Sequence, residues 1–213
     1  MPVYSFSTHA ATRFCLVWKI EESLATLRLQ LPPQFLADFH SLGLSSQDRM
    51  GQSLAVRVAL YTLLKKLGFP ILPLSKNKQG RPIFVHSSFH ISFTHTRYAA
   101  AVALSTAFPI GIDLEMVKPS LHLVQEKFLT KEEIEAANHC LEKLAIYWGA
   151  KEALYKRLDG QQCVSWKHIV IEPFHLHPKG ALTAHLHGAR YIMSYEQMID
   201  GELPPHVLVY TEN

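Results

Sequence analysis

The sequence predicts an α+β fold made of two similar halves. Strand-like and helix-like segments alternate along the 213 residues, with 48% hydrophobic and 18% charged residues, an ordinary balance for a globular protein. The segment LVWKIE at 16–21 aligns without gaps on IGIDLE at 110–115, an offset of 110 − 16 = 94 residues. At the same offset, AVRVALY at 55–61 falls on GAKEALY at 149–155. A strand followed by a helix at one fixed offset is what a duplicated unit would give.

The two halves differ in their acidic residues. Asp113 aligns with Lys19 and Glu152 aligns with Val58, so only the second half carries acids at these positions. We therefore expect one functional site per chain. The predicted halves are residues 1–105 and residues 106–213.

In the first half, the clearest element is a long helix over 48–67. Leu54, Val58 and Tyr61 recur there at spacings of three and four, Asp48 is the expected N-cap, and Gly68 follows the end. The other predicted elements are a strand over 14–20, a short helix over 24–31 ended by Pro32 and Pro33, a polar turn region over 75–82, and strands over 90–93 and 98–104.

The second half is predicted to begin with a strand over 110–116, followed by helices over 131–139 and 142–158. Its tail is strand-like. The expected strands are 169–172, a run from Phe174 that turns at Pro178-Lys179-Gly180, 191–195 and 207–210.

Composition limits the classes of function. A net charge of +3 suits an acidic partner or a phosphorylated ligand, but it is far from the concentrated charge of a dedicated nucleic-acid binder. The N-terminus lacks the basic start and apolar stretch of a signal peptide, and the most apolar window, 98–112, is too short to span a bilayer. Cys15, Cys140 and Cys163 are widely spaced, which predicts reduced thiols. We expect a cytoplasmic protein with no membrane or nucleic-acid partner.

Asp113 and Glu115 lie two residues apart on the predicted strand 110–116, so their side chains emerge on the same face. Two carboxylates this close repel each other unless a cation or solvent compensates them. Such oxygen donors suit Mg²⁺, which takes a few carboxylates and keeps positions for water and substrate phosphates. The alternative is an edge strand whose acidic face is solvated.

The helical segment 147–156 brings a third carboxylate. Its stripe at spacings of three and four contains Trp148, Glu152, Tyr155 and Lys156, with Lys151 beside it. Such a helix can pack on a sheet while Glu152 reaches a metal and the lysines reach phosphate oxygens. The alternative is a Glu152–Lys156 surface pair, worth about 0.2–0.5 kcal/mol.

Two shorter segments add candidate ligand-binding residues. Thr94 and His95 are predicted to lie in a turn between two strands, where a hydroxyl and an imidazole can reach a common ligand. Arg81 lies in a turn that also contains Lys76 and Lys78. A structural histidine and a merely solvated basic loop are the alternatives.

These segments together resemble the Sfp-type 4′-phosphopantetheinyl transferases. That family has a G-[IV]-D-[IL]-E strand and a W-x-x-K-E-[AS]-x-x-K helix, matched here by GIDLE, with KFLTKEE following it, and by WGAKEALYK. GRP at 80–82 and FTHT at 93–96 resemble two further family segments. The resemblance covers roughly residues 49–160, in the family's order. It implies a pseudo-dimer of two similar α/β halves in one chain, with the active site at their interface.

The resemblance also implies roles for the acids and lysines. Asp113, Glu115 and Glu152 would hold Mg²⁺ against the pyrophosphate of coenzyme A, and Lys156 and Lys151 would add positive charge at the same phosphates. Glu133 matches a carboxylate proposed to deprotonate the acceptor serine, for which a metal-bound water is the alternative. The residues with catalytic roles would then be Glu133, Glu152 and Lys156.

In the first half, Arg81, Thr94 and His95 match positions that grip the 3′-phosphate and adenosine of coenzyme A. An arginine early in the long helix completes the family set, and Arg49 and Arg57 both compete for that place. One departure is Gly149-Ala150, where family members commonly carry Ser or Thr and then an apolar residue.

Alternating histidines in the tail have no counterpart in the family. His175, His177, His185 and His187 flank the predicted Pro178 turn and would share one strand face. That geometry can bind Zn²⁺ or Ni²⁺, and the alternative is a solvated outer face.

The leading expectation is therefore a monomeric, Mg²⁺-dependent transferase that moves 4′-phosphopantetheine from coenzyme A to a serine of an acyl or peptidyl carrier protein. One alternative is a catalytically weakened module that only binds coenzyme A or a carrier protein. Another is a metal-dependent phosphohydrolase.

Overall fold

The computed structural model describes residues 2–9, 11–159, 165–199 and 201–212. The chain forms two compact units, Met1–Pro109 and Ile110–Asn213, which are described one at a time. None of the helices in the described ranges is long and apolar enough to cross a lipid bilayer. Neither Cys15 nor Cys140 is part of a disulfide among the described residues, and Cys163 lies outside them.

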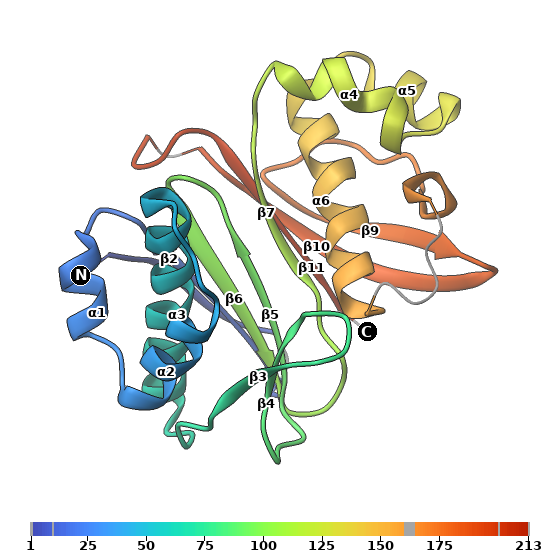
Figure 1. Cartoon of the computed structure of the whole chain (residues 1–213). Helices are drawn as coiled ribbons and strands as arrows, with labels where there is room; N and C mark the ends of the chain where they lie inside the picture. The colour runs from blue at the N-terminus through green and yellow to red at the C-terminus, as the bar shows by residue number, and fades with distance from the viewer. Residues whose placement is uncertain (1, 10, 160–164, 200, 213) are drawn as a thin grey trace. The chain divides into compact units, whose positions relative to one another are not determined.

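The first unit is a four-stranded antiparallel sheet, in the order β1-β2-β6-β5, with helix α3 packed on β2 and β6 (Figure 1). Its elements are β1 (Val3–His9), β2 (Arg13–Lys19), α1 (Leu24–Leu29), α2 (Pro33–Ser41), α3 (Gln47–Leu67), β3 (Leu74–Lys76), β4 (Pro82–Phe84), β5 (His90–His95) and β6 (Ala99–Ser105). The core lies between the sheet and α3, where Leu16, Leu54 and Val102 are fully buried.

Helix α3 confirms the strongest helical prediction and corrects its start. The N-cap is Ser46, and Asp48 instead lies in the first turn, where its negative charge complements the helix dipole. The helix ends at Gly68, whose φ of +69° is the left-handed conformation that glycine adopts most easily.

Several local predictions in this unit were incomplete or wrong. The turn region predicted over 75–82 is shorter than expected, because strand β3 extends to Lys76 and strand β4 begins at Pro82. Strand β1 and helix α2 were not predicted, and α2 begins at Pro33, one of the two prolines expected only to stop a helix. A proline is tolerated in the first turn because the amide hydrogen it lacks has no partner there. Thr94 and His95 lie at the end of strand β5, and the turn itself follows them.

The second unit is a five-stranded antiparallel sheet, in the order β7-β11-β10-β9-β8, with helix α6 packed on β7 and β11 (Figure 1). Its elements are β7 (Ile112–Met116), α4 (Ser120–Phe128), α5 (Lys131–Ala137), α6 (Leu141–Arg157), the 3₁₀ helix η1 (Trp166–His168), β8 (Val170–Ile171), β9 (Lys179–Leu186), β10 (Ala189–Met198) and β11 (His206–Thr211). Helix α4 was not predicted. The hairpin turn was misplaced: it lies at His187 and Gly188, and Pro178 precedes the first strand of the hairpin.

The two units share one chain order and pairing pattern. In each, a strand precedes the long helix and pairs with the unit's last strand, which pairs with the strand before it: β2-β6-β5 in the first unit and β7-β11-β10 in the second. The internal alignment places two of these elements opposite each other, β2 with β7 and α3 with α6.

Candidate functional site

Two glycines allow β7 and α6 to approach closely. A Cβ on Gly111, just before β7, would lie 1.8 Å from the Ala153 carbonyl oxygen, so only glycine fits there without a backbone shift. A Cβ on Gly149 would lie 3.6 Å from Asp113 Oδ2, which places this carboxylate against the helix. The first residue of the GIDLE motif therefore has a packing role.

The close approach brings together the three predicted carboxylates. Asp113 is only 5% exposed, and Glu115 and Glu152 are half-buried. Burial raises the pKa of Glu152 to about 7, helped by the negative charges of Asp113 and Glu115 and opposed by Lys156. Burial also raises the pKa of Glu115, while Lys118 opposes that shift.

Two lysines neutralise part of this charge. Lys156 Nζ lies 2.6 Å from Asp113 Oδ1 and donates to the Ile112 carbonyl at 3.1 Å. Lys118 Nζ lies 2.8 Å from Glu115 Oε1. Lys156 therefore pairs with Asp113, and not with Glu152 as in the surface pair considered as an alternative, although it remains close enough to lower the pKa of Glu152.

These residues have the right donor chemistry for a hard divalent cation. Carboxylate oxygens are the ligands that such ions prefer, and the pKa of Glu152 is raised first by burial and then by the negative charges of Asp113 and Glu115, which a bound cation would offset. Within the described ranges, no three His, Cys, Asp or Glu side chains are arranged to hold a metal ion. Asp113 and Glu115 instead each direct a carboxylate oxygen at a lysine.

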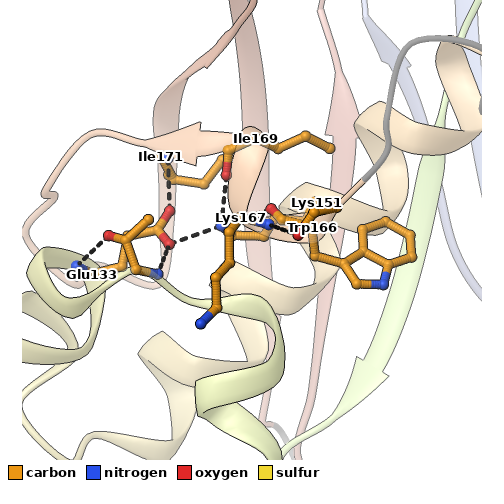
Figure 2. Close-up of polar contacts among 8 residues, drawn as sticks. Glu133, Lys151, Trp166, Lys167, Ile169 and Ile171 are labelled. Atoms are coloured by element: carbon orange, nitrogen blue, oxygen red, sulfur yellow. Dashed lines mark hydrogen bonds and ion pairs between the residues drawn. The ribbon is translucent and has the colours of Figure 1, made fainter.

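Glu133 and Lys151 form a separate, fully buried ion pair, shown in Figure 2. Their side chains are 2% and 0% exposed, and Lys151 Nζ lies 2.8 Å from Glu133 Oε2. The other carboxylate oxygen accepts the Ile171 amide at 2.9 Å. Glu133 also closes a capping box with Thr130 at the start of α5. This arrangement does not support the roles predicted for Glu133 as a base and for Lys151 as a phosphate ligand.

The predicted ligand-binding residues of the first unit lie in three places: the first turn of α3, the loop before β4 and the end of β5. Arg49 is exposed in the first turn of α3, and Arg81 lies in the loop before β4, where its amide donates to Asn77 Oδ1 at 2.9 Å. Thr94 is buried and His95 is exposed at the end of β5.

Arg57, the rival candidate to Arg49, is almost fully buried. Its guanidinium pairs with Asp38 of α2, with Nε 2.8 Å from Oδ2, and its Nη1 donates to Ser53. These contacts are structural, which leaves Arg49 as the candidate at the start of α3.

A pocket of about 470 Å³ adjoins Glu115. Glu115 and Lys118 line its polar side, and Phe128, Trp148 and Trp166 supply aromatic walls. The Trp148 ring lies 4.9 Å from Phe128 and 5.4 Å from Trp166, centre to centre. Sequence reasoning missed Trp166, because no motif or periodic pattern includes it.

The tail histidines do not gather at one point. His185 pairs with Glu172 at 2.6 Å, and the ring of His187 lies 6.0 Å from that of His168. His175 and His177 belong to the segment before β9, so they do not share a strand face with the other two.

Residues 109–204 match the family model of the 4′-phosphopantetheinyl transferase superfamily. The matched range contains β7, α6 and the aromatic pocket, and therefore all the candidate acids and lysines of the second unit. The superfamily match indicates phosphopantetheine transfer, with coenzyme A and a carrier protein as partners in general. Among curated proteins, none matches the chain at the level that would establish relatedness.

Proposed function

We propose that this protein transfers the 4′-phosphopantetheine arm of coenzyme A to a serine of an acyl or peptidyl carrier protein and releases 3′,5′-ADP. The observation that carries the proposal is the gathering of Asp113, Glu115, Glu152 and Lys156 in a domain that matches the transferase superfamily. As in the Sfp-type enzymes it resembles, the chain would work as a monomer with two similar halves.

Asp113, Glu115 and Glu152 are the residues that would hold Mg²⁺. When bound, the ion would neutralise charge on the pyrophosphate of coenzyme A. The protein's own contribution begins with Lys156, which the Asp113 carboxylate and the Ile112 carbonyl hold in place. Its ammonium would stabilise negative charge on the departing 3′,5′-ADP.

In the transfer step, the serine oxygen bonds to the β-phosphorus of coenzyme A, the bond from that phosphorus to the oxygen of 3′,5′-ADP breaks, and the proton of the serine hydroxyl passes to water. No role in this step is assigned to Glu133, because both of its carboxylate oxygens have buried partners.

We propose that the pantetheine arm binds in the aromatic pocket formed by Phe128, Trp148 and Trp166. The pocket begins at Glu115, one of the three acids, and its exposed lining surface is mostly apolar and aromatic, with Lys118, Ser120 and Lys127 as further polar residues. Arg49, Arg81, Thr94 and His95 are proposed to bind the 3′-phosphate and adenosine, as the family resemblance implies.

The test is to incubate the protein with coenzyme A, Mg²⁺ and several apo carrier proteins and to measure the mass of each carrier. We expect the gain of one phosphopantetheine arm, its loss in Asp113→Ala and Glu152→Gln, and no change in Glu135→Gln, which alters an exposed acid of α5. Failure to modify any carrier, or full activity in both site variants, would refute the proposal.

A catalytically weakened module that binds coenzyme A or a carrier is the second candidate. The lysine partners of Asp113 and Glu115 favour it, because those ion pairs stand where metal coordination would be needed. Calorimetry separates the two candidates: coenzyme A binding that is indifferent to Mg²⁺, without transfer, identifies the binding module.

A further inference from the structure

We propose that Lys151 and Glu133 are positioning residues that hold Trp166 in the wall of the aromatic pocket and do not touch substrate. The inference rests on the proposed function only for the identity of the pocket's occupant, the pantetheine arm. The evidence comes from the contacts of the two side chains and from a matching pair in the first unit.

The ammonium of Lys151 already has three acceptors. These are Glu133 Oε2 at 2.8 Å, the Ile169 carbonyl at 2.5 Å and the Trp166 carbonyl at 3.2 Å (Figure 2). An ammonium group has three hydrogens, so its donors are fully used. With an exposed fraction of 0%, Lys151 also offers no surface to a phosphate.

These contacts fix the segment that carries the Trp166 indole. Lys151 binds the carbonyls at the start of η1 and just beyond its end, and Glu133 binds the amide of Ile171 in β8. The indole is then packed between Trp148 at 5.4 Å and Tyr155 at 4.8 Å. A three-residue 3₁₀ helix has few backbone hydrogen bonds of its own, so the buried pair supplies much of its anchoring.

The first unit contains an equivalent buried ion pair but lacks the candidate metal-site acids, because Lys19 and Val58 stand opposite Asp113 and Glu152. The repeat offset of 94 places Arg57 opposite Lys151, and Arg57 also pairs with an acid of the preceding short helix, Asp38, at 7% and 8% exposure. In that unit Val58 stands opposite Glu152. The first unit therefore keeps the buried cation, Arg57, although it has no acid at the place of Glu152. This favours a structural role for the buried cation in both units.

The experiment compares the binding of two ligands to the full-length protein and its variants. Coenzyme A carries the pantetheine arm, whereas 3′,5′-ADP lacks it. In Glu133→Gln and Lys151→Met we expect coenzyme A affinity to fall by about tenfold, because the pocket wall must be ordered on binding. The affinity for 3′,5′-ADP should stay unchanged, and tryptophan emission should shift as Trp166 becomes more exposed.

Asp38→Asn is the matched control. It removes the acid of the equivalent pair in the first unit, so we expect a comparable loss of thermal stability with an unchanged ratio of the two affinities. If a single variant at Glu133 or Lys151 does not fold, the double variant Glu133→Gln/Lys151→Met is used. It leaves no unpaired buried charge but cannot hold the Trp166 and Ile169 carbonyls, so coenzyme A affinity should still fall.

Three results would overturn the proposal. Unchanged affinities with lost turnover in Glu133→Gln would identify Glu133 as a base, and equal loss of both affinities in Lys151→Met would identify a phosphate ligand. Wild-type coenzyme A affinity in the double variant would show that the pair does not set the pocket wall. If the wild-type protein binds no coenzyme A, the proposed function fails, whereas an emission shift in the variants would still support the positioning of Trp166.

Discussion

Replacing Gly111 with alanine tests whether the close approach of β7 and α6 holds the candidate site together. The added Cβ would lie 1.8 Å from the Ala153 carbonyl oxygen and 2.9 Å from the Arg157 amide nitrogen. Contacts below 3.0 Å essentially do not occur for a real Cβ, so strand and helix must separate by at least 3.0 − 1.8 = 1.2 Å. Because the obstructing atoms belong to the backbone, we expect the free energy of unfolding to fall by about 3 kcal/mol, near the upper end of what overpacking costs.

The same displacement would move Glu152 and Lys156 away from Asp113. A misplacement of about 1 Å is enough to lower turnover by about 100-fold. Urea unfolding gives the change in stability, and carrier-protein modification gives the change in turnover.

Gly149→Ala is the control for this experiment. Its Cβ would meet the Val209 side chain at 3.0 Å, and a side chain can move where backbone cannot. We expect a change within about 1 kcal/mol, since alanine also favours the helix. If Gly111→Ala unfolds within about 0.5 kcal/mol of the wild type and keeps its turnover, the packing argument is wrong.

Three further predictions concern the same unit. Because the pKa of Glu152 is raised from its ordinary 4.5 to about 7, the metal-free protein should lose on the order of 3 kcal/mol of stability as pH rises between these values. Melting temperatures should show that Glu152→Gln removes this dependence of stability on pH. They should also show that Mg²⁺ stabilises the wild type more at pH 8 than at pH 5. Lys156→Met should lower turnover by about 100-fold, measured by carrier modification, because it removes a charge placed for the leaving group. Thr130→Ala should cost about 1 kcal/mol in urea unfolding, because it removes half of the capping box of α5.

Each has a result that would count against it. A pH-independent melting temperature in the wild type would contradict the raised pKa of Glu152. Near-normal turnover in Lys156→Met would remove that lysine from the mechanism, and an unaffected Thr130→Ala would mean that the cap contributes little to stability.

Hydrophobic periodicity in the sequence was sufficient to predict the helices and strands that bury one regular face. Helices α3 and α6 and strand β7 were predicted close to their observed bounds. Helix α4 was missed because Leu123 and Val124 are apolar yet exposed, which blurs its pattern. Helix α2 was missed because its first residue, Pro33, was interpreted only as a stop signal.

For the candidate site, the sequence predicted what depends on local spacing and missed what depends on contacts between distant segments. Alternation on a strand placed Asp113 and Glu115 on one face, and helical spacing placed Glu152 and Lys156 on one stripe. Spacing could not show that Lys156 would pair with Asp113, 43 residues away, or that Lys151 and Glu133 would bury each other.

By itself, the sequence determined the acids, the glycines and the order of the motifs, and hence the resemblance to a transferase family. Only the tertiary structure decided which charged side chains lie at the candidate metal site and which are buried in the core. The physical reason is that the direction of a side chain is set by its own helix or strand, whereas its burial and its partner depend on segments that fold against it from elsewhere in the chain. Thus Glu152 and Lys151 are neighbours in one motif, yet the first remains in a charged site and the second anchors the Trp166 segment.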